Sequence, residues 1–157
     1  MRGRLSYELD VGASAEEVWK IYSSPELPTI LAKIYPGVTE KIEMNGNGGA
    51  GTTIHIVLAQ GLPEPRSWKE VFVKIDNQER LRVVKQIEGG YLDMGFDSFE
   101  YYFKIIEKDE HSCIIRSTMA FEIDDKLEGK AFLVNGNLMW GMAKAIASYV
   151  VENVGKT

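Results

Sequence analysis

The chain is poor in the residues that bind metals or form disulfides: its 157 residues include one cysteine, Cys113, and two histidines. A single cysteine forbids an intrachain disulfide, which fits a reducing compartment. A zinc site needs about four clustered ligands, so we expect no metal site. Cys113 is followed by Ile114 and Ile115, and we interpret it as a small residue of the core.

Long apolar runs are also absent from the sequence. Residues 131–143 form the longest uncharged stretch of the C-terminal part, and they fall short of the ~20 apolar residues that a membrane span needs. Near the N-terminus, Asp10, Glu16 and Glu17 come before any apolar run, so this segment lacks the hydrophobic part of a signal peptide. We therefore expect no contact with a membrane and a cytoplasmic location.

The charge balance is acidic, and the size suits one domain. Lys and Arg number 18 against 23 Asp and Glu, which gives a net charge of −5 and a pI near 5.1. This is the wrong sign for a protein that binds phosphate backbones. Hydrophobic residues make up 45% and charged residues 26%, which is the balance of a globular protein with a substantial core. We expect a single domain over residues 1–157 and no nucleic-acid partner.

A glycine-rich segment, residues 46–51, matches the G-x-G-x-x-G pattern of dinucleotide-binding loops. That pattern requires a following helix, whose N-terminal amides bind a pyrophosphate. Residues 52–57 instead have the composition of a strand. We therefore interpret the segment as a glycine-rich hairpin rather than a nucleotide site.

The order of elements predicts an α+β domain. Residues 4–11 alternate apolar and polar side chains, as in a half-buried strand. Ser14 and Glu17 form a capping box that opens a short helix, and a second short helix runs over residues 26–34, with Pro28 in its first turn. β-branched and aromatic residues then predict strands at 39–44, 52–59, 67–75, 80–87, 96–106 and 112–123.

The last part of the chain changes its pattern. From Asp125 the apolar residues recur at steps of three and four, among them Phe132, Met139 and Met142. Asp125 and Glu128 resemble a capping box, so we predict one amphipathic helix of about 30 residues from Asp125. Strands first and a long helix last are typical of a curved antiparallel sheet that packs around that helix.

Alternation on the strand at 67–75 places Trp68, Glu70 and Phe72 on one face. A carboxylate is rarely buried without a partner, so the pattern alone favours a solvated Glu70 over one inside a pocket. The next strand carries Arg82, which can reach that carboxylate across the ladder.

The strand at 96–106 is rich in aromatic residues, with Phe99 and Tyr101 among them. This is much aromatic surface for one strand to place in a solid core. The concentration of rings is one reason to consider a cavity.

Four segments together resemble one family. They are the glycine loop, residues 87–95 (Ile-Glu-Gly-Gly-Tyr-Leu-Asp-Met-Gly), the strand at 112–118 and the long C-terminal helix. On these the chain resembles the plant pathogenesis-related class 10 proteins, the family of the birch pollen allergen Bet v 1, and within it the norcoclaurine synthase-like branch. The resemblance implies a helix-grip fold, in which a seven-stranded curved antiparallel sheet, two short helices and the long C-terminal helix enclose an apolar cavity.

The resemblance also implies a small aromatic ligand and a chemistry. Norcoclaurine synthases join an arylethylamine to an aldehyde in a Pictet–Spengler condensation without a cofactor. Family catalysis is attributed to a tyrosine, a glutamate, a lysine and an aspartate, whose positions hold Trp68, Glu70, Arg82 and Tyr101 here. We therefore expect three catalytic residues: Glu70 as the base, Tyr101 as a proton donor, and Arg82, whose charge either holds Glu70 ionised or binds a carboxylate of the ligand. The expected substrate-binding residues are Trp68, Phe72, Tyr35, Tyr91, Phe99, Met139 and Met142.

Two other functions remain open from the sequence. One is a non-catalytic carrier or sensor of a hydrophobic metabolite or plant hormone. Gly61-Leu62-Pro63 resembles the gate loop of abscisic acid receptors, although their His-Arg-Leu latch is absent after Gly89-Gly90. The other is a defence protein that acts on RNA, which the acidic balance disfavours. We favour the enzyme, acting as a monomer or a weak dimer.

Overall fold

Seven antiparallel strands form one sheet in the computed structural model, which describes residues 1–154. The strands are β1 (Arg2–Val11), β2 (Thr39–Asn45), β3 (Thr53–Leu58), β4 (Ser67–Asp76), β5 (Leu81–Gly89), β6 (Phe96–Asp109) and β7 (Ser112–Ile123). Their order in the sheet is β1-β7-β6-β5-β4-β3-β2, so β2 to β7 form a meander and β1 pairs with β7 at one edge.

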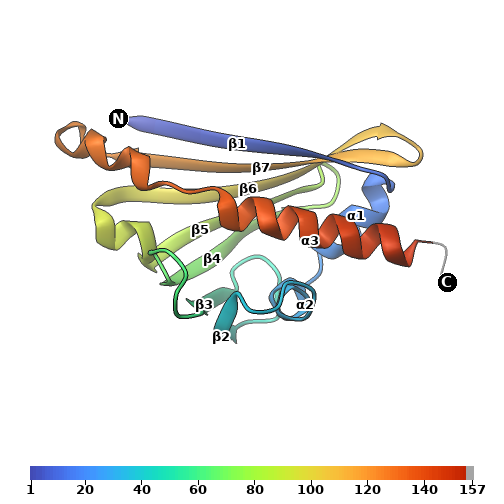
Figure 1. The fold of residues 1–157 in the computed structure, drawn as a ribbon, viewed down its shortest axis with the longest axis horizontal. Coiled ribbons are helices and arrows are strands. Elements are labelled where there is room, and N and C mark those ends of the chain that lie inside the picture. The colour runs from blue at the N-terminus through green and yellow to red at the C-terminus, as the bar shows by residue number, and fades with distance from the viewer. Residues whose placement is uncertain (155–157) are drawn as a thin grey trace.

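The helices gather on one face of this sheet (Figure 1). They are α1 (Ala15–Tyr22), α2 (Leu27–Ile34) and α3 (Asn137–Asn153), with 3₁₀ helices η1 (Gly90–Met94) and η2 (Asp125–Leu133). α3 runs across the face and contacts α1 and α2 at one end of the molecule. The α+β class and the helix-grip architecture are confirmed.

Strand alternation builds the core beneath α3. On β6, Phe99, Tyr101, Phe103 and Ile105 follow one another at every second position and are at most 5% exposed. They join one apolar cluster with Ile146 of α3. Burying a side chain of this size stabilises the fold by roughly 1.5–3 kcal/mol relative to leaving it exposed, so this face holds α3 on the sheet.

The short helices begin where their caps predict. The Ser14 hydroxyl accepts a hydrogen bond of 3.2 Å from the backbone N–H of Glu17 at the start of α1. Pro28 lies in the first turn of α2, where its missing N–H costs no helical hydrogen bond. Both short helices are confirmed.

The glycine-rich loop connects β2 to β3 as a hairpin, which confirms that interpretation. Gly48 has a φ of 91°, in the left-handed region that glycine adopts without strain. A Cβ at Gly48 would also collide with the carbonyl of Pro25. Glycine at this position thus lets the loop pack against the connection between α1 and α2.

The C-terminal helix is long but begins later than predicted. α3 begins at Asn137, so the prediction of one continuous helix from Asp125 is wrong. The preceding η2 has no buried residue, and Phe132 within it is 82% exposed. Since η2 buries no apolar face, it lacks the tertiary packing that would stabilise it as the first turns of α3. Gly136 marks the break, because it packs against the ring of Tyr7 where a Cβ would collide.

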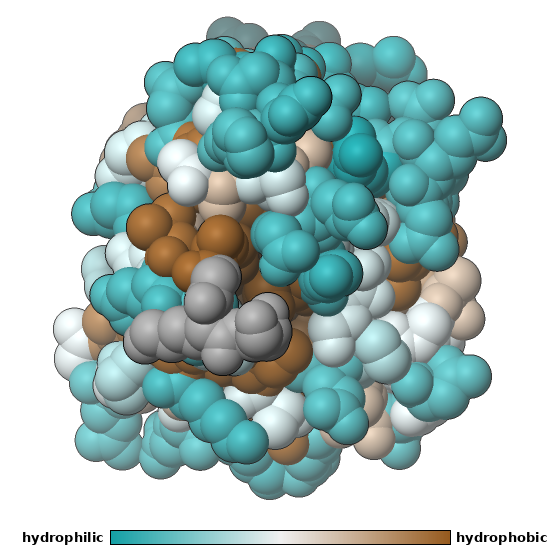
Figure 2. Space-filling model, turned by 90° about the vertical axis from the view of Figure 1, so that its right-hand side faces the viewer, coloured by the Kyte–Doolittle hydropathy of each residue, from teal (hydrophilic) through white to brown (hydrophobic). Residues whose placement is uncertain are grey.

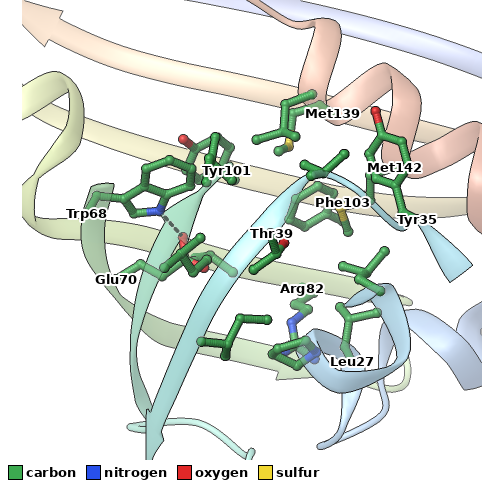
Figure 3. A pocket seen from close by; sticks show the side chains of 18 of the residues that line it. Leu27, Tyr35, Thr39, Trp68, Glu70, Arg82, Tyr101, Phe103, Met139 and Met142 are labelled. Carbon is green, nitrogen blue, oxygen red and sulfur yellow. Dashed lines mark hydrogen bonds between the residues drawn. The ribbon is translucent and has the colours of Figure 1, made fainter. Parts of the chain in front are cut away.

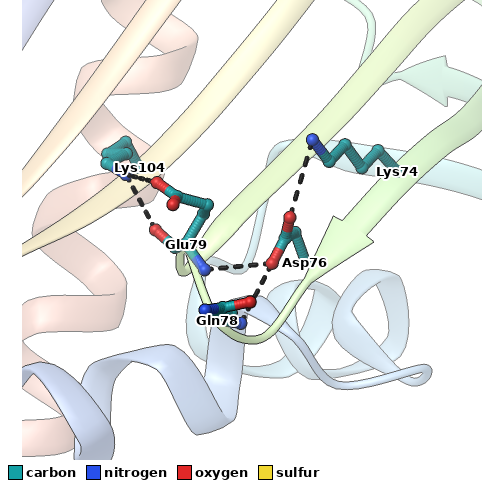
Figure 4. A network of polar contacts seen from close by, with 5 residues as sticks. All are labelled: Lys74, Asp76, Gln78, Glu79 and Lys104. Atoms are coloured by element: carbon teal, nitrogen blue, oxygen red, sulfur yellow. Dashed lines mark hydrogen bonds and ion pairs between the residues drawn. The ribbon is translucent and has the colours of Figure 1, made fainter.

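A polar network fixes the turn between β4 and β5, next to the strands that carry the site (Figure 4). One carboxylate oxygen of Asp76 accepts hydrogen bonds of 3.0 Å from the backbone N–H groups of Gln78 and Glu79. Lys104 of β6 donates to the backbone carbonyl of Glu79 over 2.9 Å. The turn therefore links β4, β5 and β6, and so helps to set the relative positions of their side chains.

The face drawn in Figure 2 is largely hydrophilic, and apolar side chains gather on it near the C-terminal end of α3. In that part of the helix Tyr149 and Val151 are 38% and 47% exposed. Within residues 1–154, no helix is long and apolar enough to cross a membrane. The same residues contain no group of three or more His, Cys, Asp or Glu placed to hold a metal ion.

Candidate functional site

An apolar cavity lies between the sheet and the helices. Its first part, which we call the Glu70 chamber, has a volume of about 110 Å³ and is lined from β2 to β6, α2 and α3. Its second part, the loop chamber, has about 300 Å³ and is bordered by residues 62–65 and by the segment before α3. Trp68, Tyr101 and Met139 border both chambers.

Strand alternation brings Glu70 into its chamber. On β4, Trp68, Glu70 and Phe72 line the cavity and are 5%, 9% and 2% exposed. Figure 3 shows the Glu70 carboxylate beside the indole of Trp68, whose Nε1 donates to Oε2 over 3.1 Å. The interpretation of Glu70 as solvated is therefore wrong, because the indole N–H replaces part of the hydration that the carboxylate loses.

Burial also sets the acid strength of Glu70. Removal from water disfavours the charged form and raises the pKa to about 7, while the hydrogen bond from Trp68 and the positive charge of Arg82 oppose that rise. Near neutral pH the carboxyl group is therefore present in both forms. It can donate a proton in one step of a reaction and accept one in another.

Arg82 lines the same chamber from β5 and is 1% exposed. Its Nη1 donates to the backbone carbonyls of Tyr22 and Ser24, over 2.9 and 3.3 Å, at the C-terminal end of α1. The ring of Phe72 lies beside the guanidinium, 4.4 Å from the central carbon to the ring centroid. Arg82 thus ties α1 to the sheet, and its charge complements the negative end of that helix.

Arg82 and Glu70 form no ion pair within residues 1–154, so the contact considered across the ladder is not made. In the β4–β5 register Arg82 stands opposite Ile75, whereas Glu70 stands opposite Gln86. The arginine therefore acts on Glu70 through its charge rather than by direct contact. Burial lowers the pKa of Arg82 to about 10, which leaves it cationic at neutral pH.

Tyr101 reaches both chambers from β6. Its hydroxyl accepts a hydrogen bond of 2.9 Å from Nε2 of Gln86. Burial, the largest cause, and the nearby Glu70 carboxylate raise the pKa of Tyr101 well above its usual value. The phenol therefore keeps its proton near neutral pH, so that it can donate a hydrogen bond but cannot serve as a base.

Most of the expected substrate-binding residues lie on the cavity wall. Those on the wall of the Glu70 chamber are Trp68, Phe72, Tyr35, Met139 and Met142. Tyr91 borders the loop chamber, and its hydroxyl accepts a hydrogen bond of 3.1 Å from the backbone N–H of Asn135. Their role in binding a ligand stays a prediction.

Phe99 is the exception among the expected wall residues. It is fully buried and stacks on Tyr91, with 4.1 Å between the ring centroids. Within the described part of the chain it borders neither chamber. Phe99 and the stacked ring of Tyr91 both belong to the apolar core, so Phe99 lies behind the wall, and its contact with a ligand stays a prediction.

Other wall residues were not expected from the sequence. They include Thr39 and Leu138 in the Glu70 chamber and Met119 in the loop chamber. Gln86, which holds Tyr101, was also missed as a site residue. The alternation of β5 indicates this position, because Gln86 follows Arg82 by four residues and therefore lies on the same face of the strand.

Comparisons with known proteins agree with this architecture. The model of the pathogenesis-related protein Bet v 1 family matches residues 1–153. S-norcoclaurine synthase 1 of Papaver somniferum is 41% identical over 155 residues, which cover 97% of this chain and 67% of that protein. Norbelladine synthase of Narcissus pseudonarcissus is 35% identical over 153 residues, which cover 97% of this chain and 94% of that protein.

A solved structure is similar over the same extent. The X-ray structure of norcoclaurine synthase from Thalictrum flavum, in complex with dopamine and hydroxybenzaldehyde, has a TM-score of 0.91 with this fold. The two chains are 33% identical, and the match covers 97% of this chain and 88% of that one. Since the family model, the relatives and the fold all agree, the chain belongs to the Bet v 1 family of pathogenesis-related proteins.

Proposed function

We propose that this protein condenses an arylethylamine with an aldehyde in a Pictet–Spengler-type reaction that forms a carbon–carbon bond without a cofactor. The observation that carries the proposal is Glu70, a carboxyl group in an apolar cavity whose pKa lies near 7. Norcoclaurine synthases are among the relatives, and the Thalictrum flavum structure holds dopamine, an arylethylamine, together with an aromatic aldehyde. Both facts support the same class of substrates for this chain.

The protonated form of Glu70 serves the first half of the reaction. The amine nitrogen adds to the aldehyde carbon and gives a carbinolamine. Glu70 donates its proton to the carbinolamine oxygen, the C–O bond breaks, and water leaves as the C=N bond of an iminium ion forms. The carboxylate that remains stabilises the positive iminium across the apolar cavity.

The ionised form serves the second half. A carbon of the aromatic ring attacks the iminium carbon, so a C–C bond forms and the π electrons of C=N move onto nitrogen. Glu70 then takes the proton from the attacked ring carbon, which restores both the aromatic ring and the acid form of Glu70. A single carboxyl group thus completes the cycle with no net gain or loss of protons, and a pKa near the operating pH suits both steps.

The neighbours of Glu70 have different tasks in this scheme. Trp68 orients the carboxylate through its indole N–H. Arg82 remains charged and therefore supplies an electrostatic field rather than a proton. Tyr101 supplies a neutral O–H donor at the boundary of the two chambers.

A non-catalytic carrier of an aromatic metabolite is the second candidate function. Arg82 favours it, because it stands at the position that the family resemblance gives to a catalytic lysine, and its Nη1 is already bound by two backbone carbonyls. In either case we propose a small aromatic or hydrophobic molecule as the partner, and a monomer or weak dimer in the cytoplasm as the working form.

The deciding experiment incubates the purified protein with dopamine and a panel of aldehydes and follows the rate and the chirality of the product. The enzyme hypothesis expects one enantiomer in excess, and a rate that falls by about 10²–10⁴-fold in Glu70→Gln. Glu110→Gln is the matched control, because the Glu110 side chain is 93% exposed, and it should keep the parent rate. A racemic product at the rate of the buffer alone contradicts the enzyme hypothesis, and saturable binding of the same compounds then supports the carrier.

A further inference from the structure

The amide of Gln86 is held at both ends behind the cavity wall. Gln86 is 1% exposed; its Oε1 accepts a hydrogen bond of 2.9 Å from the backbone N–H of Tyr91, and its Nε2 lies 2.9 Å from the hydroxyl of Tyr101. A backbone N–H can only donate, so the oxygen end of the amide must face Tyr91. The nitrogen end therefore faces Tyr101.

This arrangement fixes the polarity of the Tyr101 hydroxyl. An amide nitrogen only donates, so the hydroxyl oxygen accepts from Gln86 and the hydroxyl proton must point elsewhere. Tyr101 is 5% exposed and borders both chambers. No acceptor for its proton is found within residues 1–154, and a buried donor without a partner costs free energy that an acceptor on a guest molecule would recover.

Gly90 makes the arrangement possible. It has a φ of 57°, and a Cβ at this position would collide with the amide of Gln86. Glycine therefore allows the chain to turn into η1 while the Gln86 side chain folds against the backbone of Tyr91. The polar contact and the turn depend on the same residue.

We propose that Gln86 is a positioning residue, which holds Tyr101 as a hydrogen-bond donor toward the cavity, and that this donor marks the subsite for the carbonyl oxygen of an aldehyde or ketone. A carbonyl oxygen accepts hydrogen bonds and donates none. It therefore suits the Tyr101 hydroxyl, which has a proton available to donate. A hydrogen bond to that oxygen draws electron density from the carbonyl carbon and stabilises the charge that develops on oxygen when an amine adds. The inference rests on the proposed function, for which it names the place of the aldehyde oxygen.

The test uses acetophenone labelled with ¹³C at the carbonyl, an aromatic ketone whose C=O stretching frequency reports hydrogen bonding directly. Bound to the parent protein, this frequency should lie below its value in cyclohexane. In Tyr101→Phe it should return toward the cyclohexane value. In Gln86→Met the lowering should diminish, and the double variant should behave like Tyr101→Phe alone, because Gln86 acts only through Tyr101.

Affinity gives a second readout, with ethylbenzene as the matched guest that lacks the oxygen. Acetophenone should bind about tenfold more tightly than ethylbenzene to the parent, and this ratio should approach one in Tyr101→Phe. Ethylbenzene should bind all variants equally, which shows that the cavity is intact. A carbonyl frequency that is the same in the parent and Tyr101→Phe, a lowering that Gln86→Met leaves unchanged, or no saturable binding of acetophenone would each overturn the proposal. A frequency shift without condensation activity would instead uphold the subsite and refute the proposed reaction.

Discussion

Replacing Glu70 by glutamine should make the protein more stable at alkaline pH. Glutamine has nearly the shape of glutamate, and its side-chain oxygen can still accept the hydrogen bond from Trp68. What the substitution removes is the ionisation of a buried carboxyl group. The unfolded chain releases this proton near the ordinary pKa of 4.5, whereas the folded chain keeps it until about pH 7.

The sign and the size of the effect follow from that difference. Between pH 4.5 and about 7 the folded state binds more protons than the unfolded state, so the free energy of unfolding falls as the pH rises. Below this window Glu70 is protonated in both states and does not make the free energy of unfolding depend on pH. Above it Glu70 is ionised in both states, and the full cost of burying its charge lowers the free energy of unfolding. A difference of about 2.5 in pKa, at ~1.36 kcal/mol for each pKa unit, corresponds to about 3 kcal/mol.

Urea or guanidinium titrations at several pH values between 4 and 8 measure this directly. Glu70→Gln should exceed the parent by about 3 kcal/mol at pH 8, and the two should converge toward pH 4. The exposed Glu110→Gln control should follow the parent at every pH. A parallel pH dependence of parent and Glu70→Gln, or a less stable Glu70→Gln at pH 8, would refute the conclusion that burial raises the pKa of the Glu70 carboxyl group.

Three further predictions concern the surroundings of the site. Gly141→Ala in α3 gains about 1 kcal/mol of helix propensity but must displace the hydroxyl end of the half-buried Tyr35 side chain. The free energy of unfolding should therefore change by no more than about 1 kcal/mol, and a loss of about 3 kcal/mol in a denaturation titration would contradict this. Gly90→Ala places a side chain at a positive φ and against the Gln86 amide. It should lower the free energy of unfolding by at least about 1 kcal/mol, which a denaturation titration measures. Asp76→Ala should lower the free energy of unfolding at neutral pH and lower it less in acid, because backbone N–H groups lower the pKa of Asp76 in the folded state. An equal loss at both pH values would contradict a stabilising role of the ionised carboxylate.

The sequence predicts the elements whose signals are local. Alternation identifies the strands, and the Ser14 cap and Pro28 locate the two short helices, because each signal acts within a few residues. The start of α3 could not be found in this way. The apolar periodicity continues through η2, but the helix begins only after Gly136 meets the Tyr7 ring, a contact between residues far apart in the sequence.

The site shows the same division between local and distant causes. Alternation places Glu70 and Trp68 on one face of β4, yet the burial of Glu70 depends on α2 and α3 closing over that face. The donor role that we propose for Tyr101 depends on the orientation of the Gln86 amide, which the backbone N–H of Tyr91 sets. The general preference of carboxylates for water favours an exposed Glu70, and a pattern in one strand cannot show which distant elements override that preference.

The pKa of Glu70 is the most direct test of the account, and ¹³C NMR of the glutamate side-chain carboxyl carbons measures it. The resonance that is present in the parent and absent from Glu70→Gln belongs to Glu70. We predict that it titrates near pH 7. Titration near 4.5, the ordinary value for a glutamate, would contradict the proton cycle that we propose for the cavity.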